Sequence, residues 1–184
     1  MLAPVIALLN RMTFTGKFLL TAVFSFIPIA YLLAIAIPNL KTAYDTAEAE
    51  ARGIVLIQSM QPALIAVQKH RGLSNAWLSG DPAAEPKVRK AADDMAAAMA
   101  ALTAESAKNG NRFSEAQGIK LMEEKWAPLA AQGPDTPAAK SFAEHTALVD
   151  HIIALAQDVA FRSGLTLDPK AESYFLQDSI VNQA

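Results

Sequence analysis

Three polar residues, His70, Arg71 and Ser74, follow a row of apolar residues that recur at helical spacing. Alternating steps of three and four residues place Arg71 and Ser74 on the inner face, with His70 on the neighbouring row. A buried guanidinium without a partner is strongly destabilising, so Arg71 requires a carboxylate or an anionic ligand. Two interpretations remain open: a structural ion pair with Asp168 or Asp178, or contact with a ligand. The apolar row that precedes these residues consists of Ile57, Met60, Leu64 and Val67.

A second polar position on an apolar face is His145, which lies one helical step before Leu148. An inward histidine is either a core group with satisfied hydrogen bonds or a ligand contact. His151 is six residues further on and does not share a face with His145 in the manner of a metal pair. The chain also lacks cysteine. We therefore expect no metal site and no cofactor.

A turn near the C-terminal end carries a third group of polar residues. Gly164 ends one helix, and Asp168 precedes Pro169 in the pattern of an N-cap followed by a proline. Tyr174 follows one turn later, where it serves either as an aromatic anchor or as the wall of a pocket against residues 70–74. The tentative ligand-binding residues are thus His70, Arg71, Ser74, His145 and Tyr174.

Catalytic motifs are missing from the sequence. It contains no glycine-rich phosphate loop, no nucleophile elbow and no HExxH segment. A hydrolase would need Ser74 or Ser141 as a nucleophile beside one of the histidines. We expect the protein not to be an enzyme.

Helix punctuation predicts the elements that position these residues. Asp81, Thr136 and Asp168 each precede a proline and are predicted N-caps, and Ser114 begins a segment with capping-box spacing. Glycines stand where left-handed helix ends are expected. The predicted helices cover 39–79, 82–108, 115–132, 137–163 and 169–184. Their short connections favour an all-α antiparallel bundle.

The inner faces of the later helices repeat the spacing of the first. They read Val88, Ala92, Met95, Met99 and Leu102; Ile119, Met122, Trp126 and Leu129; and Leu148, Ile152, Leu155 and Val159.

An uncharged run at 18–37 precedes the bundle. Twenty helical residues span roughly 30 Å, which matches the hydrocarbon core of a bilayer. Arg11 and Lys17 precede the run and have no acidic neighbour within residues 1–40, so the positive-inside rule places the N-terminus in the cytoplasm. The prediction is a cytoplasmic segment 1–17, a transmembrane helix 18–38 and an extracytoplasmic domain 39–184. The alternative is a signal peptide cleaved after Ala34-Ile35-Ala36.

The chain beyond the run contains 14 of the 16 basic residues and all 18 acidic residues, which gives it a formal charge of −4. An acidic surface does not suit nucleic acid. The expected partners are the inner (cytoplasmic) membrane, a small molecule and a second copy of the chain. If successive helices alternate direction, the last one points away from the membrane. A chain that passes a signal inward must return to the membrane, so we expect this one to be the N-terminal part of a longer protein.

Several short motifs occur in a familiar order. They are Gln68-x-His70-Arg71-Gly72-Leu73-Ser74, Trp126, Ser141-x-x-x-His145-x-x-Leu148, and Ser163-Gly164-Leu165-x-Leu167-Asp168-Pro169-x-x-x-Ser173-Tyr174-x-Leu176. Together they resemble the helical extracytoplasmic sensing region of bacterial methyl-accepting chemotaxis proteins and related sensor kinases. The segment around Arg71 is also similar to nitrate- and nitrite-sensing helical domains, which implies a small anion as ligand.

The resemblance implies the sensory part of a transmembrane chemoreceptor that transmits an extracytoplasmic signal to a cytoplasmic module. Two alternatives remain: the sensor region of a histidine kinase or diguanylate cyclase, or a single-pass helical structural or assembly protein.

Overall fold

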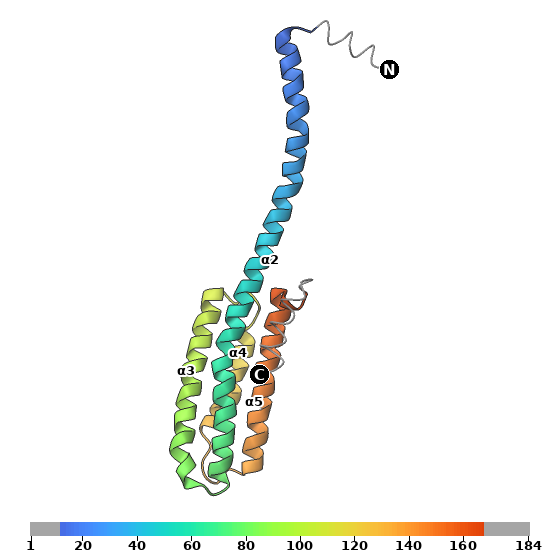
Figure 1. The fold of residues 1–184 in the computed structure, drawn as a ribbon. Coiled ribbons are helices and arrows are strands. Elements are labelled where there is room, and N and C mark those ends of the chain that lie inside the picture. The colour runs from blue at the N-terminus through green and yellow to red at the C-terminus, as the bar shows by residue number, and fades with distance from the viewer. Residues whose placement is uncertain (1–11, 168–184) are drawn as a thin grey trace. The chain divides into compact units, whose positions relative to one another are not determined.

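The computed structural model describes residues 12–167, and no strand occurs among them. The all-α prediction is therefore confirmed for this part of the chain. Figure 1 shows the elements in order. They are α2 (Phe14–Leu78), the 3-10 turn η1 (Pro82–Ala84), α3 (Glu85–Asn109), α4 (Ala116–Ala130), α5 (Ala138–Ser163) and the 3-10 turn η2 (Leu165–Leu167). The predicted helix 169–184 lies outside the described residues.

Helix α2 contains the apolar run that the sequence singled out. It includes three prolines, Pro28, Pro38 and Pro62, each of which removes one backbone donor. Thr42 Oγ1 donates to the carbonyl oxygen of Pro38 at 3.1 Å. By length and composition, α2 holds a segment long and apolar enough to cross a membrane, and none of that segment is buried within the protein.

The chain divides into two compact units between Asp45 and Thr46. The first contains the apolar run, and its large side chains, such as Phe18, Phe24 and Leu32, are exposed. The second contains the remaining helices and all the residues discussed below. By length and composition, these exposed apolar side chains belong to a candidate membrane span.

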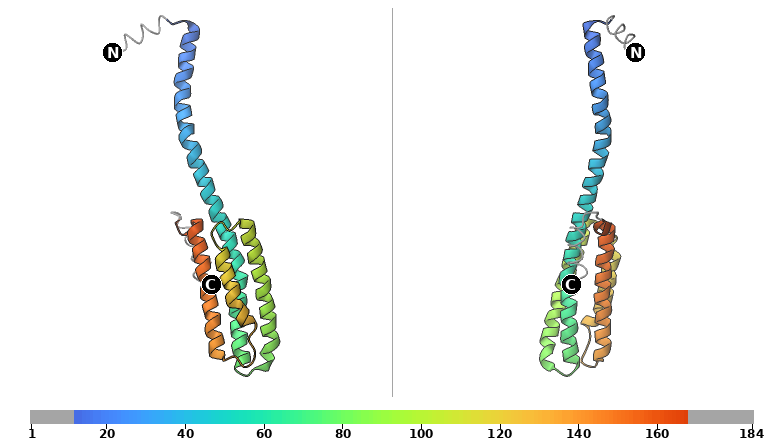
Figure 2. Two further views of the ribbon diagram at one scale, coloured as in Figure 1. Left: turned by 180° about the vertical axis from the view of Figure 1, so that it is seen from behind. Right: turned by 45° about the vertical axis from the view of Figure 1, so that its right-hand side comes forward.

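Within the second unit, α3, α4 and α5 lie side by side with the later part of α2 (Figures 1 and 2). One core joins all four helices, and its fully buried members include Met60, Met95, Met122 and Leu148. The predicted inner rows are confirmed: all of their residues are buried except Ala92, which is partly buried and packs on the core. Helical spacing alone identified these contacts.

Helix α2 ends as the sequence predicts. Gly80 has a φ of 107°, and its amide donates to the carbonyl of Trp77, while the amide of Asp81 reaches back to Ala76. The Asp81 carboxylate then accepts from the amide of Ala83 at 3.0 Å, which confirms this N-cap. These bonds satisfy groups that a helix end leaves unpaired.

Two predicted caps are wrong. Pro137, not Thr136, is the N-cap of α5, and no side chain caps it. The backbone of Pro137 is extended (ψ 124°), so the helix begins one residue later than the proline pattern predicted. Ser114 has a φ of 59° and forms no capping box; instead, the Asn111 side chain accepts from the amide of Ala116.

The buried carboxylate of Glu115 organises the connection between α3 and α4. It is 0% exposed and accepts from Ser106 Oγ at 2.9 Å and from the amide of Phe113 at 3.0 Å. Both oxygens therefore have a donor, as a buried carboxylate requires. This role replaces the capping role that the spacing had assigned to the segment.

Close packing of α2 on the end of α5 depends on Gly53. A Cβ there would lie 2.3 Å from Ser163 Oγ and 2.4 Å from Ser163 Cβ, whereas a Cβ at Gly72 meets nothing within 4 Å. We therefore expect Gly53→Ala to lower the free energy of unfolding by about 1–3 kcal/mol through overpacking. Gly72→Ala should raise it by about 0.5–1 kcal/mol because alanine favours helix.

Thermal unfolding of both variants in detergent micelles, followed by circular dichroism, tests this order. Equal midpoints for the two variants would contradict the close contact at Gly53.

Candidate functional site

Two histidines from different helices meet in the core of the second unit. His70 lies on α2 and His145 on α5, and they are 1% and 0% exposed. His70 Nδ1 is 2.7 Å from His145 Nε2, and the rings stack with centroids 5.0 Å apart. The structure thus brings together two of the residues predicted from the sequence, although they are 75 positions apart.

The hydrogen bonds determine which nitrogen of each ring carries a proton. His145 Nδ1 lies 2.7 Å from the carbonyl oxygen of Ser141, which can only accept, so Nδ1 is the donor. In a neutral ring, His145 Nε2 is then an acceptor, and His70 Nδ1 must donate to it. His70 Nε2 consequently carries a lone pair.

Both serines of the predicted motifs join this contact. Ser74 Oγ is 3.2 Å from His70 Nδ1 and can only accept from it. Ser141 Oγ donates to Gln132 Oε1, and Gln132 Nε2 donates to Glu144 Oε2 at 3.1 Å. The result is a connected polar network that crosses from α2 to α5 and reaches the end of α4. We call Ser74, His70, His145, Ser141, Gln132 and Glu144 the histidine network.

One polar atom of the network has no partner among the described residues. His70 Nε2 is buried and makes no hydrogen bond. The ring meets Trp126 edge to face, with centroids 4.8 Å apart, so its surroundings are largely apolar. An unpaired buried acceptor costs about 1–3 kcal/mol and is a feature that a ligand or a water can relieve.

Burial keeps both rings neutral. Desolvation, and then the proximity of His145, lower the pKa of His70 from its ordinary value of 6.5 to about 4. Desolvation also lowers the pKa of His145, with a smaller contribution in the same direction from Arg71; the Ser141 carbonyl and Glu144 oppose the shift. The tautomers deduced above therefore hold at neutral pH.

Arg71 lies at the edge of the core and not inside it, which corrects the expected inner position. Its guanidinium donates to Thr146 Oγ1 at 3.2 Å and lies 4.8 Å above the ring of Phe142. Adjacent residues on a helix point about 100° apart, so only one of His70 and Arg71 can face the centre. A histidine can be buried neutral, whereas arginine keeps its charge and takes the rim.

The partner expected for Arg71 is not found within residues 12–167, where no carboxylate forms an ion pair with it. Asp168, Asp178 and Tyr174 lie outside the described residues, so the structural ion pair, the Asp168 cap and the Tyr174 pocket stay predictions.

The histidine network does not activate a nucleophile. Ser74 and Ser141 are 2% and 1% exposed, and each faces a ring nitrogen that already carries a proton. Neither histidine can therefore accept a proton from these hydroxyls. The third histidine, His151, bonds through Nε2 to the carbonyl oxygen of Gly118 at 2.8 Å.

Sequence reasoning missed Gln132, Glu144, Thr146 and Phe142. Glu144, Thr146 and Phe142 lie on α5, each next in sequence to a residue that the sequence analysis had named. Gln132 follows the last turn of α4, and no local sequence pattern predicts which residues its side chain contacts.

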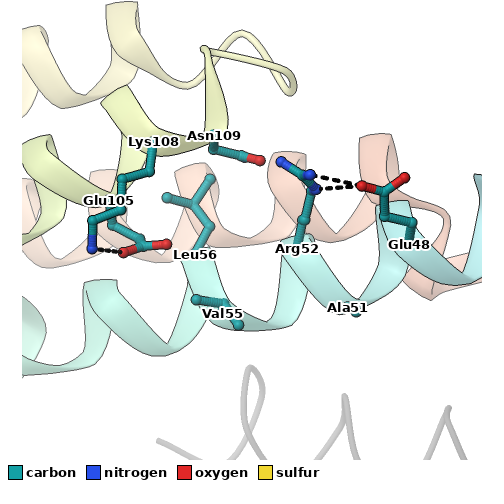
Figure 3. Close-up of a pocket in the computed structure, with 8 residues that line it drawn as sticks. All are labelled: Glu48, Ala51, Arg52, Val55, Leu56, Glu105, Lys108 and Asn109. Atoms are coloured by element: carbon teal, nitrogen blue, oxygen red, sulfur yellow. Dashed lines mark hydrogen bonds and ion pairs between the residues drawn. The ribbon is translucent and has the colours of Figure 1, made fainter.

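A cleft of about 390 Å³ lies between α2 and α3 (Figure 3). Its charged groups pair within their own helices, Arg52 with Glu48 and Lys108 with Glu105. The side-chain nitrogen and oxygen of Asn109 have no partner among the described residues. Within residues 12–167, no group of three or more His, Asp or Glu side chains is arranged to hold a metal ion.

Comparisons with protein-family models, curated proteins and solved structures give no match for this chain.

The pKa of His70 makes stability depend on pH. Between pH 6.5 and about pH 4, the His70 ring binds a proton in the unfolded chain but not in the folded one. The contribution of neutral His70 to the free energy of unfolding is therefore complete above pH 6.5 and decreases as the pH falls toward 4. The loss should reach a few kcal/mol, on the order of 1.4 kcal/mol per unit of pKa shift. Urea unfolding at several pH values between 7.5 and 5 measures it.

The matched control replaces both rings, as His70→Leu with His145→Leu. Removing both partners of a buried hydrogen bond leaves no orphan from that pair. This variant should lose most of the slope; an unchanged slope would assign the pH dependence to other groups.

Proposed function

We propose that the chain is the sensory part of a transmembrane chemoreceptor, in which an extracytoplasmic antiparallel helical bundle binds a small molecule. The observation that carries this proposal is the histidine network: a polar, incompletely satisfied group of side chains from α2, α5 and the segment after α4, in which both histidine rings are buried. Such networks weaken packing relative to apolar contacts, and two arrangements of comparable free energy then become accessible.

The membrane assignment rests on the apolar run of α2 and on its flanking charges. Arg11 and Lys17 favour a cytoplasmic N-terminus in the inner membrane, and the second unit is then extracytoplasmic. A signal passes inward if occupancy changes the packing of α2 against its neighbours, because α2 carries both the apolar run and His70. The resemblance to chemotaxis receptors favours a homodimer.

Arg71 is the proposed contact for a small anion. Its guanidinium is held by Thr146 and Phe142 at the rim, where it retains unused N–H donors. Guanidinium presents several donors in a plane and binds oxyanions through them. Its position directly beside His70 couples an anion there to the histidine network through the backbone of α2.

The sensor region of a histidine kinase or of a diguanylate cyclase would have the same features as that of a chemoreceptor. Only the module downstream of the sensor region distinguishes these three classes of protein. A different class, a membrane-anchored assembly protein, is favoured by exposed apolar side chains on α2. Ile54, Val55 and Ile65 are 38%, 48% and 62% exposed. Such a surface suits a protein partner or a second copy of the chain.

A thermal-shift screen with small anions, amino acids and organic acids tests the sensory proposal. A ligand at 100 times its dissociation constant adds about 2.7 kcal/mol to the free energy of unfolding. Nitrate and nitrite are the first anions to test. If no compound in the screen stabilises the chain, the assembly role becomes the better account.

Arg71→Leu should abolish stabilisation by the anion. Lys69→Leu is the matched control, because it removes the same charge from α2 on the side that faces Asp94 of α3 at 3.3 Å. Equal losses in both variants would mean that the anion senses net charge and not the Arg71 contact.

A further inference from the structure

A second cleft, of about 500 Å³, lies at the other side of the histidine network from Arg71. Its walls come from the end of α2, the start of α3 and the end of α4, and they include His70, Trp77, Glu85, Arg89, Asp93 and Gln132. Within residues 12–167, by contrast, the hydrogen bond and the ring contact of Arg71 both go to α5. We propose that this cleft binds a small primary ammonium compound, which donates to His70 Nε2 and lies near the carboxylate of Asp93.

The first argument is the direction of the hydrogen bonds. His145 Nδ1 must donate to the Ser141 carbonyl, so His145 Nε2 accepts from His70 Nδ1, at 2.7 Å in both contacts. His70 Nε2 is left as a buried acceptor without a partner. A ligand that completes the network must therefore bring an N–H or O–H donor.

The second argument is the charge of the wall. Arg89 is already paired with Glu85 in the same turn of α3. Asp93 lies one turn beyond Arg89 on α3 and forms no ion pair within residues 12–167, so the wall carries one uncompensated negative charge. Trp77 adds an indole, the aromatic ring that attracts an organic cation most strongly. An ammonium group satisfies the acceptor, the carboxylate and the ring together.

An anion fits this cleft poorly. It would face the lone pair of His70 Nε2 and the free charge of Asp93, and it could bond to His70 only after the ring gained a proton that its burial disfavours. The ligand expected in this cleft is thus a cation, whereas the ligand proposed for Arg71 is an anion. Because the two sites use different residues, failure of one proposal leaves the other intact.

The test titrates the full chain in detergent micelles with three small probes, and binding is followed by calorimetry and thermal unfolding. Ethylammonium should give a saturable signal and raise the midpoint. Ethyltrimethylammonium has the charge but no N–H donor and should bind about tenfold more weakly. Propionate should not bind in the cleft. Equal signals from all three probes, or none from ethylammonium, would overturn the proposal and leave a water as the partner of His70 Nε2.

Neighbouring carboxylates on α3 supply a matched pair of variants. Asp93→Asn should weaken ethylammonium binding by up to about fivefold, the largest effect expected of one exposed charge. Asp94→Asn should leave it unchanged, because Asp94 faces Lys69 and Lys90 outside the cleft. Equal effects of the two substitutions would overturn the assignment to the cleft.

His70→Asn separates the two nitrogens of the ring. The asparagine amide can still donate toward His145, as Nδ1 does, but it offers no group in place of Nε2. Ethylammonium binding should be lost while circular dichroism reports an intact helical fold. Retained binding would contradict the proposal, and if this variant unfolds, the comparison of Asp93 with Asp94 still decides.

Discussion

The hydrogen bond between His70 and His145 is the interaction on which the polar interior of this protein depends. It links α2 to α5 at a depth where neither ring meets solvent, and it fixes the tautomers of both. The direction of the bond between the two rings comes from the Ser141 carbonyl, which forces a proton onto His145 Nδ1. One backbone oxygen therefore determines that a free lone pair appears at His70 Nε2, on a different helix.

The surrounding apolar core explains why this bond matters. Met95, Met122 and Leu148 are fully buried at the centre, and hydrophobic contacts alone do not specify one register of helices strongly. A buried polar bond is directional, so sliding or rotating α2 against α5 breaks it and leaves two unpaired groups. The histidine network accordingly favours one packing of the two helices while adding little net stability.

Much of this arrangement could be predicted from the sequence because helix ends and inner rows are local properties. Gly80 and Asp81 stop and restart the chain through their own backbone and side chain, and residues such as Ile119 and Val159 are buried because of their spacing. His70 and Arg71 show the limit. Periodicity could not decide which of these two adjacent residues faces the centre. The answer depends on the cost of desolvating a charge: histidine can be buried in its neutral form, whereas arginine stays charged. Gln132 was out of reach for another reason: α4 ends at Ala130, and the direction of the chain beyond it follows from packing on Ser141 and Glu144.

The position of Arg71 at the rim gives the site two faces with opposite chemistry. On one side, a permanent cation is held against Thr146 and Phe142; on the other, His70 lines the second cleft together with residues of α3 and of the end of α4. Because His70 and Arg71 are consecutive on one helix, a rotation of α2 that moves one of them toward the centre moves the other away. If both proposed ligands bind, the same rotation couples them, and the sign of the coupling depends only on which residue each ligand draws outward. Two sites on one helix turn can in this way oppose or reinforce each other without touching.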